Sequence, residues 1–359
     1  MNSALLPFVQ SPIAFGSGFL ALLKPVVMPC FCLISGHFSP AEIDDRRARS
    51  LCQLFATYLI FQTLYFLQNM ISYRLNGFEY PSLPLPLFNP QGQVVTWFLL
   101  ALLLWRIWMP LLNRTRWPIA ISLCLGCGAL FVDLGVNHQN ILSFLPYYVA
   151  GNRLPRSLWS RDASQPWLRV PFALFFLAVM VGLLCFSAFG GAHFAKGFAK
   201  LSLTYACFNG APPEALADQC HTPRELLYRL AFYCCSVPLI MGFLCLMPTR
   251  AGVWTYPGYM SMYVYLMHPL VLFNPIVMHF TFELLSSIYG REVNVWSPAT
   301  AVSVIGMLVP AALLVCALLS TPAARCAFRL LVEPPTDLLF KRAAAHRQDL
   351  EAALGPSSS

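Results

Sequence analysis

Charged residues are scarce in this chain of 359 residues, in which Asp, Glu, Lys and Arg make up 11% and hydrophobic residues 58%. Soluble domains carry roughly 25% charged residues, so the chain lacks the polar surface that a water-soluble protein of its size needs. Its apolar residues come in long blocks, and about 20 consecutive apolar residues suffice for one helix to cross a bilayer. The blocks do not alternate with the period of two that a membrane barrel requires. The composition therefore excludes a soluble protein and predicts an all-α, polytopic transmembrane helical bundle.

Two further absences concern targeting and metal binding. The N-terminal sequence MNSALLPFVQSPIAF has no basic n-region, so it does not read as a cleaved signal peptide. Cys124 and Cys127 form a CxxC, but no second Cys pair or His pair completes a zinc site, and we expect no metal. Cys207 and Cys220 fall in one loop that we place outside, where both a disulfide and two free thiols stay open.

The apolar runs predict about nine membrane spans. The run Ile141–Gly151 is too short to cross alone unless the helix tilts or continues past these residues. Residues 1–322 form the membrane domain, and residues 323–359 form a tail whose end, GPSSS, is predicted to be disordered. The predicted spans are Phe19–Phe38, Leu51–Ile71, Val94–Leu112, Trp117–Leu134, Ile141–Gly151, Val170–Gly190, Leu226–Met247, Met260–Phe282 and Ala299–Ser320.

The net charge of +8 is better explained by basic loops that set membrane orientation than by binding to nucleic acid. If the loop Ser39–Ser50 is cytoplasmic and the spans alternate, fifteen of the 23 Lys and Arg residues are cytoplasmic. Five lie in the outside loops, and three lie within spans. We therefore expect a multi-pass protein with its basic loops and its C-terminus in the cytoplasm and its N-terminus outside.

The segment MPCFCLISGHFSP, Met28–Pro40, is the first unusual one. Gly36 is a plausible C-cap for the preceding helix, and His37 stands at that helix end. Arg46 and Arg49 follow at the start of the next helix, where a spacing of three puts both on one face. Two guanidinium groups there could clamp a phosphate, or they could set topology by contacting lipid headgroups, and both interpretations stay open.

Two other spans carry polar or aromatic residues. Trp97 and Trp108 are expected to form aromatic belts at the two membrane interfaces, and Arg106 can extend its charge toward one of them. His268 is deep in a span, followed by Pro269. An ionisable group inside a membrane is a functional candidate, whereas a neutral His bonded to a backbone carbonyl is a structural one.

Five segments occur in an order that resembles the acyltransferase-3 family of integral membrane acyltransferases, especially its plant, algal and fungal versions. They are MPxFxxISGxF, R-x-x-R, WFLLALLLWR, FLPYYVAGNRL and YVYLMHPL, and they extend from Met28 to about Pro322. The resemblance implies ten or eleven helices and a transferase that moves an acyl group from cytoplasmic acyl-CoA to a hydroxyl, usually on a carbohydrate. It implies acyl-CoA as a co-substrate and no cofactor, and as partners the acyl-CoA donor, a hydroxylated acceptor and the lipid bilayer, with no nucleic acid.

The same resemblance implies residue roles. Arg46 and Arg49 match the R-x-x-R that meets the acyl donor in the family. Residues of the shared motifs are expected to line a cavity or to be structural: Ser35, Gly36, His37, Trp97 and His268. The family's catalytic base is a His in its first helix, and here no His precedes His37 among the seven present. We name neither His37 nor His268 as its substitute.

This departure leaves three readings of the function. We expect that the sequence as written lacks the first family helix and is inactive in this form, while the complete protein is an O-acyltransferase. The alternatives are a catalytically inactive membrane protein of the same fold and a small-solute transporter. The transporter reading rests on short spans such as Ile141–Gly151, but the chain shows no inverted repeat.

The sequon Asn113-Arg114-Thr115 tests the orientation. It falls in a loop that we place in the cytoplasm, so we predict that Asn113 carries no glycan. Treatment of the expressed protein with peptide N-glycosidase should leave its mobility on a gel unchanged. A shift that disappears in the Asn113→Gln variant would show that the orientation is inverted.

Overall fold

The computed structural model describes residues 14–39, 44–75, 96–131, 136–155, 166–188, 223–247, 252, 255–272, 287 and 310–335. Every element that these residues form is a helix, as the composition predicts. The helices are α2 (Ala14–His37), α3 (Asp45–Leu75), α4 (Thr96–Asn113), α5 (Pro118–Gly128), α6 (Val136–Arg153), α7 (Pro166–Ala188), α10 (Pro223–Leu246), α11 (Thr255–Tyr259), α12 (Ser261–Leu272) and α15 (Pro322–Val332). A 3-10 turn, η1 (Ala129–Phe131), follows α5, and a helix Pro310–Leu319 precedes α15.

Three of the described helices are long and apolar enough to cross a bilayer, namely Arg47–Ile71, Thr96–Asn113 and Arg229–Leu246. A fourth crossing is the pair Pro310–Leu319 and α15 if the two count as one span, although they are bent by 74°. Shorter apolar helices cover Val26–His37, Pro118–Phe131 and Val170–Val181. The short run at Ile141–Gly151 does continue past its boundaries, because α6 extends over 18 residues.

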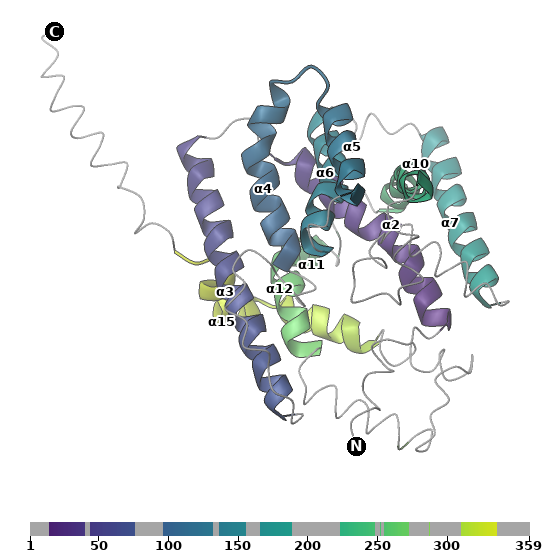
Figure 1. The fold of residues 1–359 in the computed structure, drawn as a ribbon. Coiled ribbons are helices and arrows are strands. Elements are labelled where there is room, and N and C mark those ends of the chain that lie inside the picture. The colour runs from purple at the N-terminus through teal and green to yellow at the C-terminus, as the bar shows by residue number, and fades with distance from the viewer. Residues whose placement is uncertain are drawn as a thin grey trace, which may run out of the picture.

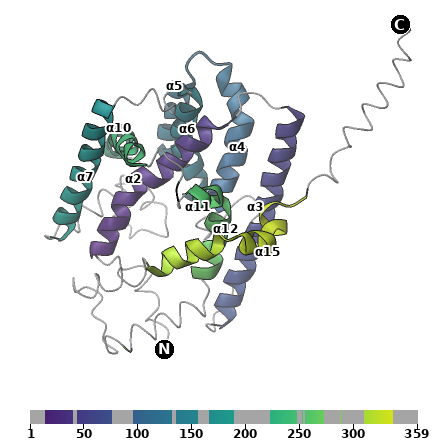
Figure 2. The ribbon, with the colours of Figure 1, turned by 180° about the vertical axis from the view of Figure 1, so that it is seen from behind.

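Figure 1 shows the helices arranged as a row with one oblique member. Along the row α3 contacts α4, α4 contacts α6, and α6 contacts α2, which crosses the others at an angle. Beyond α2 lie α7 and α10, which pack on each other and on α2, while α5 packs on α6. The view from behind in Figure 2 shows α12 and α15 together beside α3, and α15 contacts both of these helices. The described helices thus form one row centred on α6, with a smaller group of helices attached at α3.

The contact between α2 and α6 is a close crossing, and two glycines permit it. A Cβ atom on Gly36 would overlap the carbonyl of Tyr148, and a Cβ on Gly151 would overlap the carbonyl of Leu33. The clashes are reciprocal, because each glycine lies against the backbone of the other helix. Small residues allow membrane helices to approach at backbone distance, where van der Waals contacts and interhelical hydrogen bonds stabilise their association.

Pro146 interrupts α6, and side chains of neighbouring helices donate to the carbonyls around it. The indole of Trp105 on α4 donates to the Ile141 carbonyl at 2.9 Å. The hydroxyl of Tyr233 on α10 donates to the Ser143 carbonyl at 2.8 Å. Pro146 has no N–H for the Leu142 carbonyl one turn earlier. The two carbonyls bonded here flank Leu142, so these side chains connect α4 and α10 to α6 next to the missing bond.

The same arrangement recurs in α12, which contains Pro269. The hydroxyl of Tyr65 on α3 donates to the Leu266 carbonyl at 2.6 Å, and the Gln68 amide donates to the Leu270 carbonyl at 3.5 Å. Polar side chains on α3 therefore serve as hydrogen-bond partners for the interrupted helix beside it.

Trp97 differs from the expected exposed belt. It is 7% exposed and its ring stacks on that of Phe144 with centroids 5.7 Å apart. Helix α4 is covered by both α3 and α6, so Trp97 packs between helices, whereas the belt expectation assumed a helix facing lipid. This burial agrees with a structural role for Trp97.

The glycine crossing predicts the effect of one methyl group. Gly36→Ala or Gly151→Ala should lower the free energy of unfolding by about 1–3 kcal/mol, because the new Cβ meets backbone that can yield only if the helices separate. The control is Gly128→Ala on α5, where a Cβ meets nothing within 4 Å. The midpoint of thermal unfolding of the detergent-solubilised protein, followed by tryptophan fluorescence, measures the effect. Equal midpoints for all three variants would contradict the close approach.

Candidate functional site

The ends of three helices meet where α2 stops. Its last turn leads into a tight turn in which the Ser39 amide donates to the Gly36 carbonyl at 3.0 Å. The Tyr148 hydroxyl of α6 donates to the Ser39 hydroxyl at 2.6 Å, and Ser39 is buried. The Gly36–Gly151 crossing allows the hydrogen bond between Tyr148 and Ser39, because it brings Tyr148 directly against the end of α2.

Asn152 connects all three helix ends. Its amide nitrogen donates to the carbonyls of Gly36 at 3.2 Å and Ser39 at 3.0 Å. Its amide oxygen accepts from the Asn113 side chain of α4 at 3.4 Å, and Arg153 donates to the Asn113 carbonyl at 3.4 Å. The carbonyls at a helix C-terminus have no partner within the helix, and here side chains of α6 supply partners for the ends of α2 and α4.

Positively charged side chains lie at this polar junction and at the nearby start of α3. The Arg106 side chain of α4 lies beside the Tyr148 hydroxyl, and its Nε is buried without a hydrogen bond to any described residue. Helix α3 begins nearby in sequence, where the Asp44 carboxylate accepts from the Arg47 amide at 2.9 Å and lies 3.7 Å from the Arg47 guanidinium. The positive end of the α3 dipole adds to the arginines there, so an anion is favoured at this end of the bundle.

The residues predicted from the family motifs fall partly at this junction. Ser35 and His37 are half-buried in the last turn of α2, with the His37 ring edge-on to Phe38 at 5.1 Å. Gly36 is the crossing residue itself. Arg49 is half-buried in the first turns of α3, and Arg46 belongs to the same helix start, although its side chain lies outside the described residues.

Trp97 and His268 are not brought to the junction. Trp97 lies in the first turn of α4 and Asn113 ends the helix, which separates them by about 24 Å along the axis at 1.5 Å per residue. His268 is on α12 next to the part of α3 that carries Tyr65, and Tyr65 is about 24 Å along α3 from Arg49. The five cavity or structural candidates therefore divide into three at the junction and two away from it.

His268 has the geometry of a bonded helix residue. Its Nδ1 is 2.9 Å from the Val264 carbonyl one turn earlier, and its ring lies 6.2 Å from that of Tyr265. A carbonyl only accepts, so Nδ1 is the donor and carries the proton. This contact satisfies the His within its own helix and agrees with a structural role.

Metal-ligand side chains do not gather in the part of the chain that the structure describes, where no group of three His, Cys, Asp or Glu residues could hold an ion. Cys124 is exposed on α5 and Cys127 half-buried, and both are free thiols. The disulfide considered between Cys207 and Cys220 lies outside the described residues. The absence of a metal in the complete protein stays a prediction.

Sequence reasoning missed four residues of the junction: Ser39, Arg106, Tyr148 and Asn152. Tyr148 and Asn152 are four apart beside Gly151, which puts them on one face of a helix next to a residue that permits close approach. That spacing was a usable signal. The inward direction of Arg106 had none, because a helix-end arginine is equally well placed to extend into water.

The comparison with protein families supports the motif order. A family model described as an acyltransferase domain matches residues 3–320, which is most of the chain. The chain belongs to the acyltransferase-3 family. No curated protein and no solved structure matches this acyltransferase-3 protein. Family membership together with the apolar helices makes the chain an integral membrane protein of a transferase family.

Asn152 provides a test of the junction. In Asn152→Asp a carboxylate oxygen replaces the amide that donates to the Gly36 and Ser39 carbonyls, so both bonds become repulsive contacts. We expect the free energy of unfolding to fall by about 2 kcal/mol or more. Asn69→Asp on α3 is the control, because the Asn69 side chain has no hydrogen bond with another described residue. Thermal unfolding in detergent compares the two, and equal losses would show that Asn152 does not hold the helix ends together.

Proposed function

We propose that this acyltransferase-3 protein moves an acyl group from cytoplasmic acyl-CoA to a hydroxyl of a glycan or another acceptor. The observation that carries the proposal is the basic junction where α2, α4 and α6 end and α3 begins. Family membership supports acyl transfer in general, and the junction supports an anionic donor.

The position of the donor site is inferred from the positive charge at the start of α3. Acyl-CoA carries phosphate groups, and arginine pairs with phosphate through two parallel donors. Arg46 and Arg49 stand at the N-terminus of α3, where backbone N–H groups and the helix dipole also favour an anion. The distribution of basic residues along the chain supports a cytoplasmic placement of this end, and the cytoplasm is where acyl-CoA is found.

The transfer itself requires a hydroxyl oxygen to attack the thioester carbonyl. The carbon–sulfur bond then breaks, CoA leaves as a thiol after taking up the proton of the hydroxyl, and an ester forms. A base within hydrogen-bond reach of that hydroxyl must accept the proton first. We assign no residue of this chain to that role, and we assign the junction to the donor alone.

The donor assignment can be tested without catalysis. Arg46→Ala together with Arg49→Ala should weaken the binding of acetyl-CoA roughly hundredfold, because two charge-assisted contacts of about 1.5 kcal/mol each are lost. Titration of the purified protein in detergent with labelled acetyl-CoA gives the dissociation constant. The matched control is Arg114→Ala with Arg116→Ala, which removes the same charge from two exposed positions beyond the end of α4.

Equal dissociation constants in the wild type and the Arg46/Arg49 variant would remove these residues from the donor site. Equal weakening in both double variants would attribute the effect to net charge. Only a loss confined to Arg46 and Arg49 supports the proposal.

A further inference from the structure

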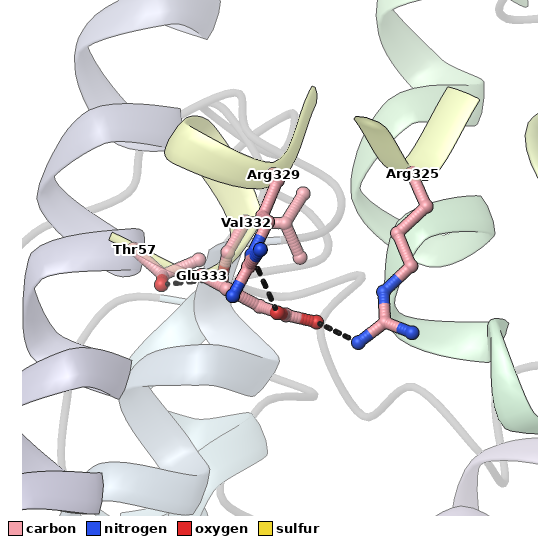
Figure 3. Close-up of polar contacts among 5 residues, drawn as sticks. All are labelled: Thr57, Arg325, Arg329, Val332 and Glu333. Atoms are coloured by element: carbon pink, nitrogen blue, oxygen red, sulfur yellow. Dashed lines mark hydrogen bonds and ion pairs between the residues drawn. The ribbon is translucent and has the colours of Figure 1, made fainter. Parts of the chain in front are cut away.

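Helix α15 is held in a fixed position on the bundle. At its start the Ala324 amide donates to the Thr321 hydroxyl at 3.2 Å, which caps the helix. At its end the Thr57 hydroxyl of α3 donates to the Val332 carbonyl at 3.0 Å, and this bond is buried. Figure 3 shows Val332 beside Thr57, with three charged side chains of the same segment next to them. The charged group is therefore attached to a defined surface formed by α3, α12 and α15.

The three charged side chains lie one turn apart on one face of the segment. Arg325 and Arg329 both pair with the Glu333 carboxylate, at 3.6 Å and 3.8 Å. Their side chains are 39% and 69% exposed, and that of Glu333 is 33% exposed. Figure 3 shows both guanidinium groups directed at this carboxylate. Two cations share one anion, so the cluster keeps an excess positive charge.

Two tyrosines, Tyr259 and Tyr263, lie next to these charged side chains. The Arg325 guanidinium lies over the Tyr259 ring, 5.8 Å from its centroid. Tyr263 is 3% exposed, and its hydroxyl is buried without a hydrogen bond to any described residue. That hydroxyl lies beside the Arg325 guanidinium and the Glu333 carboxylate. A phosphate oxygen placed beside this hydroxyl could accept a hydrogen bond from it.

The depth of the cluster along α3 indicates where it meets the membrane. The apolar part of α3 begins near Leu51, and Thr57 is about 9 Å further along the axis. A hydrocarbon core is roughly 30 Å thick, so the end of α15 lies about 9 Å inside one boundary, a depth from which a long arginine side chain can extend toward the headgroups. Phosphate groups of lipids and of bound acyl-CoA are found at that boundary.

We propose that Arg325, Arg329 and Tyr263 form a binding site for a phosphate group, which the Glu333 carboxylate occupies while no phosphate is bound. Guanidinium groups bind phosphate in the same forked geometry as carboxylate. The Tyr263 hydroxyl supplies one further donor. The phosphate belongs either to an anionic lipid headgroup or to the CoA part of the donor, and the two sources can be distinguished.

The experiment uses the full chain in a nonionic detergent. Its midpoint of thermal unfolding is measured with increasing dioctanoyl phosphatidic acid, with increasing CoA, and with dioctanoylglycerol, which has no phosphate. A ligand that binds only the folded protein raises the midpoint with its concentration. We expect a rise with phosphatidic acid or with CoA and none with dioctanoylglycerol.

Three variants assign that rise to the cluster. Arg329→Gln should weaken binding about tenfold, because one charge-assisted contact is lost. Tyr263→Phe should weaken it about threefold to tenfold. Glu333→Gln should strengthen it about tenfold, because the competing carboxylate is removed. This gain cannot result from misfolding. Arg74→Gln, at an exposed arginine in the last turn of α3, is the control and should change nothing.

The outcomes separate the sources. A phosphatidic acid effect that responds to these variants identifies a lipid site, and a CoA effect that responds to them identifies a second contact for the donor. The proposal is overturned if neither ligand raises the midpoint, if Glu333→Gln binds no more tightly than the wild type, or if Arg74→Gln weakens binding as much as Arg329→Gln. It does not depend on Arg46 and Arg49, so the donor site can fail while this site stands.

Discussion

The contact of α2 with α6 at Gly36 and Gly151 is the constraint from which the rest of the described structure follows. Helix backbones that touch leave no room for side chains between them, so the polar groups near the crossing must bond to each other. Tyr148 and Asn152 do so with the turn that ends α2. Because Asn152 also bonds to Asn113, the position of α4 follows from the same crossing.

Interrupted helices impose the second constraint. Prolines in α6 and α12 leave backbone groups without helical partners, and the bilayer offers no water to replace them. Aromatic side chains on the neighbouring helices bond to carbonyls close to these prolines, with Trp105 and Tyr233 bonded to α6 and Tyr65 to α12. In the sequence these residues look like ordinary core residues, yet each one forms a hydrogen bond that fixes the register of two helices.

The difference between local sequence pattern and contact with another helix explains how much the sequence could predict. Apolar run length located α2 to α7 with ends that differ by up to six residues, because a long apolar run predicts a membrane helix whatever its neighbours are. Motif order identified the family, and it placed His37 and Arg49 near the junction. The inward direction of Arg106 and the burial of Trp97 depend on which helix covers which face, and no local pattern reports that. Asn152 could have been found, since it stands beside a glycine in a shared motif.

The length of helix α3 indicates where its charged ends lie relative to the hydrocarbon core of the membrane. Its 31 residues make it about 46 Å long, which exceeds a hydrocarbon core of roughly 30 Å. The apolar stretch from Leu51 to Ile71 alone measures about 31 Å, so the excess falls at the two charged ends. The end that carries Arg46 and Arg49 must therefore extend beyond the hydrocarbon into water. In the proposed function, the phosphate groups of the donor would meet these arginines there without entering lipid.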